Sequence, residues 1–179
     1  MRFNAPKNMV FLGAIALFLV VGVVPAQAVP IEVDFTATNF SSGAPTDPVT
    51  GTIIYQAAST TADIVSLTSI NLTIGGYTYS ISEVGFISPY GTGGAYLAIG
   101  GKLNGVDAGN FLTNDFLLTW EKATLSSPYF VYTSTSSSSA WSTITFSQFS
   151  VTAVPEPATM LLLGSGLIGL WRLRRKFKK

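Results

Sequence analysis

Residues 69–81 read Ser-Ile-Asn-Leu-Thr-Ile-Gly-Gly-Tyr-Thr-Tyr-Ser-Ile, and they carry the clearest structural signal in the chain. On each side of Gly75-Gly76 every second residue is apolar, and such residues point to the same face of a strand. These residues are Ile70, Leu72, Ile74, Tyr77, Tyr79 and Ile81. Two adjacent glycines suit a type I′ or II′ turn, because such turns need positive φ angles. The segment therefore predicts an antiparallel hairpin.

The same alternation continues in both directions, from residue 29 to about residue 153. The serine-rich run 134–139 is expected to be a hairpin loop, because strand-type sequence resumes directly after it. Glycine, serine and threonine dominate the connections, and no part of this body has a helical period. The pattern predicts an all-β fold, an antiparallel β-sandwich or jelly-roll-like body. Besides the hairpin, strands are expected at 31–35, 51–56, 95–99, 111–120, 129–133 and 142–151.

The N-terminal segment has the three parts of a secretory signal peptide. A positively charged start is followed by an unbroken apolar run at 9–24, and then by Ala26-Gln27-Ala28, whose small residues fit a signal peptidase site. We expect signal peptidase to cleave after Ala28. The alternative is a retained membrane anchor, but the apolar run falls short of the ~20 residues that a spanning helix needs.

The C-terminal segment joins a glutamate between two prolines to a short apolar run and a basic tail. Pro155-Glu156-Pro157 can neither continue a strand nor enter a helix interior. Residues 158–171 are apolar and would form a helix of ~21 Å, shorter than the ~30 Å hydrocarbon core. We expect a short membrane helix. The cations behind it place the tail in the cytoplasm and the body outside, and they are Arg172, Arg174, Arg175, Lys176, Lys178 and Lys179.

Residues 154–179, VPEPATMLLLGSGLIGLWRLRRKFKK, resemble the PEP-CTERM sorting domain of Gram-negative bacteria that make exopolysaccharide. The matching parts are the triplet, the glycines of LLGSGLIGL and the arginine-rich terminus. The resemblance implies a recognition element for exosortase, a membrane-embedded cysteine transpeptidase-like enzyme, and a basic stop behind the helix. These two elements are Pro155, Glu156 and Pro157, and Arg172, Arg174 and Arg175. An ordinary single-pass anchor with chance prolines is the alternative.

Three domains follow from these features: a signal peptide at 1–28, a β-sandwich body at 29–153 and a sorting domain at 154–179. The resemblance implies export across the inner membrane, transient anchoring through the C-terminal helix, and then a place in the cell envelope or outside the cell. The implied partners are signal peptidase, an exosortase-type enzyme and the membrane.

Composition excludes several classes of function. Residues 29–154 carry eight acidic residues against Lys102 and Lys122, a net charge of −6 that disfavours nucleic-acid binding. The chain has no cysteine and no histidine, which excludes disulfides, Ser-His-Asp and Cys-His catalysis and His-ligated zinc. Glu32-x-Asp34 matches part of a jelly-roll glycanase motif, but the third acid is missing, and alternation on an edge strand explains it more simply. We expect no enzyme and no cofactor.

Turn residues between 104 and 115 form a weak calcium candidate, because they concentrate oxygen ligands. Tight turns explain the same residues, and the spacing of an EF-hand is absent. The candidate ligands are Asn104, Asp107 and Asn110, followed by Asn114-Asp115.

Aromatic residues of the body suggest a surface on which sugar rings stack. Aromatic residues on strands are also frequent in cores and in cross-strand pairs, so both interpretations stay open. The candidates are Trp120, Trp141, Tyr77 and Tyr79.

The leading interpretation of function is an exported structural or adhesive protein of the extracellular matrix of a biofilm, processed at its tail. The alternative is a carbohydrate-binding module that holds exopolysaccharide at the cell surface.

Overall fold

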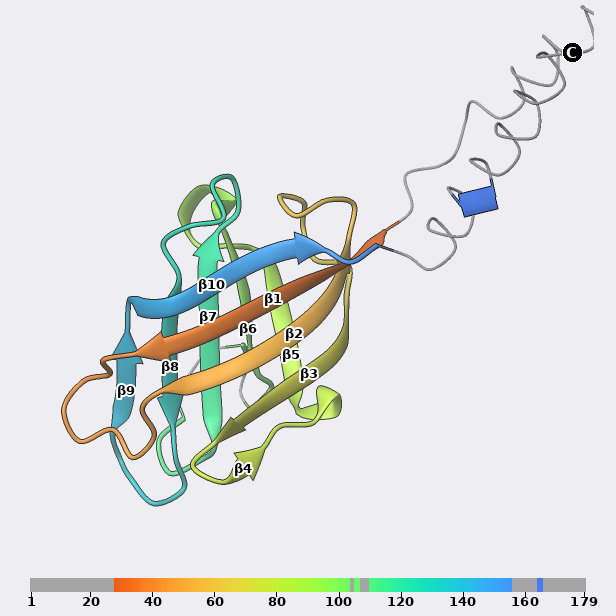
Figure 1. Cartoon of the computed structure of the whole chain (residues 1–179). Coiled ribbons are helices and arrows are strands. Elements are labelled where there is room, and N and C mark those ends of the chain that lie inside the picture. The colour runs from red at the N-terminus through yellow and green to blue at the C-terminus, as the bar shows by residue number, and fades with distance from the viewer. Residues whose placement is uncertain (1–27, 104, 107–109, 156–163, 166–179) are drawn as a thin grey trace, which may run out of the picture.

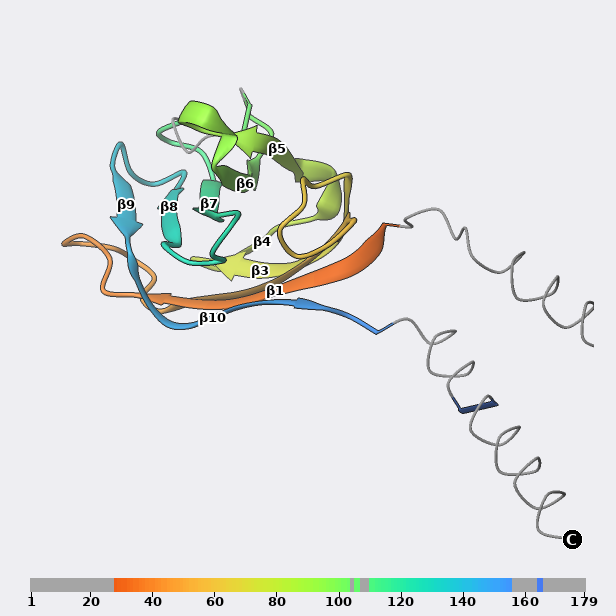
Figure 2. The same ribbon diagram turned by 90° about the horizontal axis from the view of Figure 1, so that it is seen from above.

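Two five-stranded antiparallel sheets packed face to face make up the fold, which is all-β and sandwich-like (Figures 1 and 2). The structure, a computed structural model, describes residues 28–103, 105–106, 110–155 and 164–165. The first sheet has the order β10-β1-β2-β3-β4, and the second has the order β5-β6-β7-β8-β9. Figure 2 shows the two layers edge-on.

The bounds of the elements are as follows. The first sheet consists of β1 (Val29–Thr38), β2 (Val49–Ala57), β3 (Ser66–Ile74), β4 (Tyr77–Thr78) and β10 (Thr145–Ala153). The second consists of β5 (Val84–Tyr90), β6 (Tyr96–Gly101), β7 (Asp115–Glu121), β8 (Tyr129–Thr133) and β9 (Ala140–Thr143). Two short 3-10 helices, η1 (Ile81–Glu83) and η2 (Thr92–Gly94), flank β5.

The predicted hairpin exists, but its second strand is short. Gly75 and Gly76 have φ angles of +58° and +82°, both positive as a type I′ turn requires, and Ile74 pairs with Tyr77. The prediction of a strand to residue 81 is wrong. Ser80 begins the η1 turn through a capping box, and this turn carries the chain across to the second sheet.

The core lies between the inner faces of the two sheets. On β1 and β2, buried residues alternate with partly exposed or exposed ones, as the sequence predicts for strands with one wet face. Aromatic rings fill much of the interior, and Phe130 lies 5.3 Å from Phe35 and 5.9 Å from Phe116, measured between ring centroids. The largest fully buried side chains are Trp120, Tyr55, Tyr132, Phe35, Phe116, Phe130, Ile31, Ile53, Leu72, Leu97, Ile99 and Leu118.

Several predicted strands differ from the observed ones. The segment predicted as a single strand at 142–151 is two, because the chain leaves the second sheet after β9 and enters the first at β10. Ile144 lies at this corner and is 78% exposed. The strand predicted at 111–120 begins only at Asp115, and β5 was not predicted at all. β1 is an internal strand between β10 and β2, so the expectation of an edge strand at Glu32 is wrong.

Both ends of the body leave the sandwich at the same place (Figures 1 and 2). β1 and β10 pair along their length, from Ile31 opposite Ala153 to Thr38 opposite Thr145. The Val154 N–H then donates to the Pro30 carbonyl at 2.8 Å, so Ala28, just before β1, and Pro155, just after β10, lie at the same end of two paired strands.

The predicted signal peptide and membrane helix fall almost wholly outside the described residues, apart from Ala28 and residues 164–165. Within the described part of the chain, no helix has the length and apolar character needed to cross a membrane. Both segments stay predictions.

Candidate functional site

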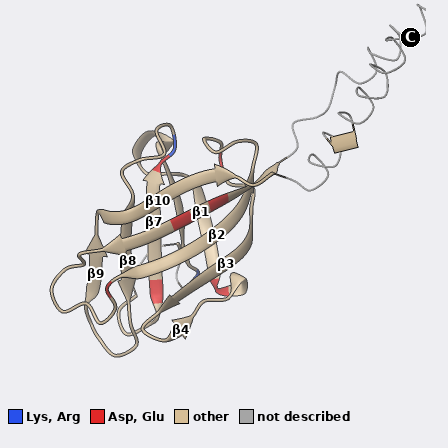
Figure 3. Cartoon of the chain, in the orientation of Figure 1, with Lys and Arg blue, Asp and Glu red and all other residues tan. Residues whose placement is uncertain are grey.

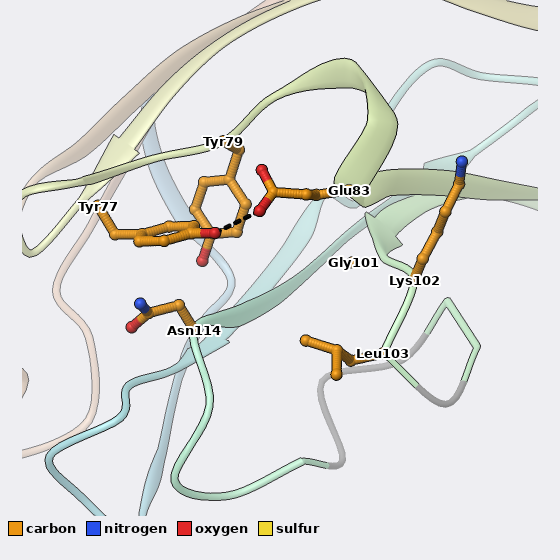
Figure 4. A pocket seen from close by; sticks show the side chains of 7 residues that line it. All are labelled: Tyr77, Tyr79, Glu83, Gly101, Lys102, Leu103 and Asn114. Atoms are coloured by element: carbon orange, nitrogen blue, oxygen red, sulfur yellow. Dashed lines mark hydrogen bonds between the residues drawn. The ribbon is translucent and has the colours of Figure 1, made fainter.

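A cavity of about 400 Å³ opens where η1 crosses between the sheets (Figure 4). Each sheet supplies part of its wall, because β4 and η1 bring one side and the ends of β6 and β7 bring the other. The Lys102 side chain extends away from the Tyr77–Glu83 pair. The lining residues are Tyr77, Tyr79, Glu83, Gly101, Lys102, Leu103 and Asn114.

Glu83 is the carboxylate that lines this cavity, and local hydrogen bonds hold it. Tyr77 Oη donates to Glu83 Oε1 at 2.5 Å, and the Ser80 N–H and hydroxyl donate to Glu83 Oε2 at 2.9 Å and 2.7 Å. Hydrogen bonds from the Ser80 hydroxyl, which has the larger effect, and from the Tyr77 hydroxyl lower the pKa of Glu83 to about 2. The group is therefore a fixed anionic acceptor near neutral pH and a poor general acid.

Tyr79 forms the inner wall of the cavity and is only 4% exposed. Its ring meets Tyr77 edge-on at 5.1 Å and Phe116 at 4.8 Å, between centroids. Burial raises the pKa of Tyr79 well above its usual range, and the neighbouring Asp115 carboxyl raises it further. Its Oη atom is buried without a hydrogen-bond partner among the described residues. Tyr79 therefore stays a neutral hydroxyl.

Gly101 leaves room for a buried carboxyl behind the cavity. A Cβ atom at this position would collide with Asp115 Oδ1, which accepts a hydrogen bond from the Phe116 N–H at 2.9 Å. The glycine is therefore required by a close approach of two neighbouring strands.

A second cavity of about 340 Å³ adjoins the first and shares Tyr77 and Asn114 with it. Backbone turns and hydroxyl side chains supply most of its remaining wall: Pro45, Ile74, Gly75, Gly76, Tyr132, Thr133, Ser134, Thr135 and Ser136. The two cavities make one groove, which we call the Tyr77–Asn114 groove. It offers a half-buried ring, an amide and several hydroxyls, groups that suit a neutral polar ligand.

The predicted sugar-stacking surface is wrong for three of its four rings. Trp120 is 0% exposed, Tyr79 4% and Trp141 6%. Strand alternation directs the two tryptophans to the inner face, and Tyr79, just after β4, packs against Phe116. Trp120 packs beside Tyr55, and Trp141 lies 5.3 Å from Tyr132 between ring centroids. Tyr77 is the candidate ring that remains partly exposed, and it lies in the groove.

The calcium candidate cannot be placed in full, since Asn104 and Asp107 lie outside the described residues. Asn110 is described, and its side-chain amide donates to the Leu103 carbonyl while its own carbonyl accepts from Thr133 Oγ1 at 3.0 Å. Among the described residues, no group of three or more acidic side chains is positioned to hold a metal ion.

Glu32 and Asp34 lie on the outer face of β1 and line neither cavity of the groove. Asp34 Oδ1 accepts a hydrogen bond from Thr52 Oγ1 at 2.7 Å. A hydrogen bond with Asp34 and the negative charge of its carboxylate raise the pKa of Glu32. An open sheet face gives these two carboxylates no cleft in which to flank a sugar.

Charged residues of the body are spread over the surface and do not form one patch (Figure 3). The described cations are Lys102 and Lys122, and Lys122 Nζ lies 2.8 Å from Asp63 Oδ1. This hydrogen bond lowers the pKa of Asp63.

Sequence reasoning missed Glu83 as a site residue. The Ser80-x-x-Glu83 spacing is that of a capping box and could have indicated a turn at this position. The meeting of Tyr77 with Asn114 could not be read from sequence, because it depends on how the two sheets pack.

The strongest functional signal lies at the end where both termini of the body emerge. Residues 153–176 match the family model described as the PEP-CTERM protein-sorting motif. No curated protein and no solved structure matches the chain. The matched region begins with Ala153, the last residue of β10, so the motif follows the folded body without a linker. The chain thus carries a PEP-CTERM sorting motif, which makes it an exported protein of the cell envelope that is processed at the membrane by an exosortase-type enzyme.

Proposed function

We propose that the chain is a non-enzymatic, matrix-associated protein that acts outside the cell once both of its ends have been processed. In this proposal signal peptidase removes residues 1–28, and the exosortase-type enzyme acts at Pro155-Glu156-Pro157. The sandwich of residues 29–153 is then the part that remains at the surface or in the matrix. The observation that carries the proposal is that the sorting motif begins in the last residue of β10.

The geometry of the two ends supports processing on both sides of the folded body. Ala28 directly precedes β1 and Pro155 closely follows its partner strand β10, so both processing sites lie at one end of the body, and the groove and loops are free to face other molecules. Prolines at 155 and 157 keep the triplet out of β10 and out of a helix interior. In this proposal a processing enzyme at the membrane surface meets the triplet directly after the folded domain, which ends with β10 at Ala153.

Chemistry in the cavity also favours a role without catalysis. Glu83 is held by three hydrogen bonds and stays ionised near neutral pH, and Tyr79 stays neutral. Neither group is poised to exchange a proton near neutral pH, which general acid–base catalysis requires.

The test replaces Pro155, Glu156 and Pro157 with alanine in the full chain. The variant should be translocated and lose its signal peptide, because translocation depends on the N-terminus alone. It should then accumulate in the membrane with its basic tail intact, detected by an antibody against the last residues. The matched control changes Ser136, Ser137 and Ser138 to alanine and should be processed normally. Processing of the triple variant at the wild-type rate would show that the triplet is not the recognition element.

A second candidate function is the binding of a neutral polysaccharide in the Tyr77–Asn114 groove. The half-exposed ring, the amide and the hydroxyls of that groove favour this ligand class. Tyr77→Ala should weaken binding of the purified full chain to a glycan array about tenfold, equivalent to ~1.4 kcal/mol. Tyr96→Ala, which removes an exposed ring outside the groove, is the control. Equal binding by both variants would argue against the groove.

A further inference from the structure

The two sheets leave strand edges that differ sharply in their protection. Edge strands expose unpaired backbone N–H and C=O groups, and proteins usually shorten, bend or cover them. The edges here are formed by β10 and β4 in the first sheet and by β5 and β9 in the second.

Three of these edges are protected. β4 has two residues, and the part of β3 that it leaves uncovered has a register irregularity opposite Ile54 and Tyr55. β5 contains Pro89 and a further irregularity between Ile87 and Tyr90. β9 is covered in part by Ser41, whose N–H donates to the Ser142 carbonyl at 3.1 Å and whose hydroxyl accepts from the Ser142 N–H at 3.3 Å.

β10 is the longest of the four edge strands, and its register irregularity lies near its start, at Ser147. It is nine residues long, reads Thr-Phe-Ser-Gln-Phe-Ser-Val-Thr-Ala, and contains neither a charged residue nor a proline. Its inward-facing side chains Phe149 and Val151 are only half-buried, since no further strand flanks them. A long, uncharged edge with partly covered apolar side chains is a template for strand addition.

The hydrogen-bond phase of β10 defines which residues face the open edge. The Val154 N–H donates to the Pro30 carbonyl, and in an antiparallel pair the residues that bond to their neighbour alternate along the strand. The backbone groups of even-numbered residues therefore face β1. Those of Phe149, Val151 and Ala153 point away from the sheet.

Two features limit the length of the open edge. The register of β10 against β1 shifts at Thr36/Ala37, which leaves Ser147 in a bulge. At the other end Pro155 has no N–H to donate. The usable edge thus runs from Phe149 to Ala153.

We infer that a second copy of this chain adds to β10 in antiparallel orientation, with Val151 of the two copies opposite each other on a two-fold axis. This register joins the open backbone groups in about six hydrogen bonds and makes one continuous ten-stranded sheet. It sets the large Phe149 opposite the small Ala153 of the second copy. On the outer face, Ser150 lies opposite Thr152 of the second copy, a hydroxyl pair that is favourable across strands.

The charge of the molecule fits a second copy as the occupant. Each body carries a net charge of −6, but β10 itself is neutral, so identical strands meet without like charges opposite each other. The nearest carboxylates, Glu32 and Asp34, lie one strand further in. The two β1 strands would be three strand spacings apart, about 14 Å, beyond the screening length of ~8 Å.

The first test uses Val151→Cys in the full, exported chain, which has no cysteine of its own. Hydrogen-bonded partners in an antiparallel pair have Cα atoms ~5.5 Å apart, within the range of a disulfide. The inference predicts a disulfide-linked dimer in the oxidising envelope, seen on a non-reducing gel. Thr50→Cys, an exposed position on the internal strand β2, is the control and should stay monomeric.

A second set of variants, made in the Val151→Cys background, separates edge pairing from random collision. Ser150→Lys with Thr152→Lys places like charges opposite each other while leaving the core untouched, and should abolish the dimer. Thr50→Lys should leave it unchanged. The inference is overturned if exported, protease-resistant Val151→Cys chains give no dimer. A dimer of equal yield in Thr50→Cys, or one that survives the paired lysines, would overturn it as well.

Discussion

The two sheets of this sandwich are built from different sequence patterns, although both are antiparallel. In the first sheet, β1 and β2 alternate between buried and less buried residues along nearly their whole length. In the second, β7 is buried at every residue from Asp115 to Trp120. Alternation of buried and exposed residues therefore indicates a strand with one face in solvent. It disappears where the outer face of the strand is covered as well.

A small outer cluster explains the lost alternation. Ala98, Leu117 and Val131 point to the outer face of the second sheet, and Val106 from the segment after β6 packs on them. A Cβ atom at Gly100 would lie 3.2 Å from Val106 Cγ1, so this cover sits close to the sheet. The second sheet has a core on each side, one large and one small.

The largest expected effect tests the main core on β8. Phe130 is 0% exposed and contacts the rings of Phe35, Phe40 and Phe116. Phe130→Ala should reduce the free energy of unfolding by about 3–5 kcal/mol, because it leaves a cavity among aromatic rings. Urea unfolding followed by tryptophan fluorescence measures the loss. A loss below about 1 kcal/mol would mean that the sheets pack differently.

The next residue along the same strand tests the outer cluster. Val131 is 8% exposed and faces the opposite side of the sheet from Phe130. Val131→Ala removes two methyl groups, each worth about 0.8 kcal/mol, so a loss of about 1–2 kcal/mol is expected in the same experiment. Ser142→Ala, a hydroxyl on the strand paired with Val131, is the control. No measurable loss at Val131 would indicate that this face is wet.

The difference between strands with one solvent-facing side and strands covered on both sides also explains which parts of the fold could be predicted from the sequence. The strands at 31–35, 51–56, 69–74 and 129–133 were recognised, as was the serine-rich loop 134–139, and Ile70, Leu72 and Ile74 do share the inner face as predicted. β5 was missed, because Pro89 and an irregular register obscure its pattern. The corner at Ile144 was missed because strand-type residues continue through it, and the change of sheet depends on tertiary packing.

The groove was less predictable than the fold. Tyr77 and Tyr79 were both candidates, but alternation alone could not tell the buried ring from the half-exposed one. The two residues face different surroundings because β4 ends at Thr78. The sorting end was the most predictable part, since its signal consists of adjacent residues and requires no tertiary contact.

A smaller effect on stability is expected at low pH in η1, where the chain passes from the first sheet to the second. Glu83 has its pKa lowered to about 2 by hydrogen bonds from Ser80 and Tyr77, below its usual 4.5. A lowered folded-state pKa contributes stability that is present above pH ~4.5 and is lost as the pH falls toward ~2. Glu83→Gln should flatten this part of the melting-temperature profile. If the melting temperature of the variant falls at low pH as steeply as that of the wild type, the Glu83 carboxylate does not stabilise the η1 turn.

The smallest effect concerns Glu32 on the solvent-facing side of the first sheet. Its pKa is shifted upward, opposite to the shift at Glu83. Its pKa is raised by a hydrogen bond with Asp34 and by the charge of that carboxylate. A raised folded-state pKa means that the native state binds the proton more tightly than the unfolded chain, so stability falls as the pH rises through that pKa. Glu32→Gln removes the repulsion and should stabilise the protein at pH 7, by no more than about 0.5 kcal/mol at this partly exposed surface site. The gain should disappear below pH ~4, where Glu32 is protonated in both states.

Thermal unfolding at the two pH values measures this gain in stability, and Thr50→Val on the same face is the control. A variant that is less stable at pH 7 would mean that the carboxylate pair is held by favourable contacts that outweigh its repulsion.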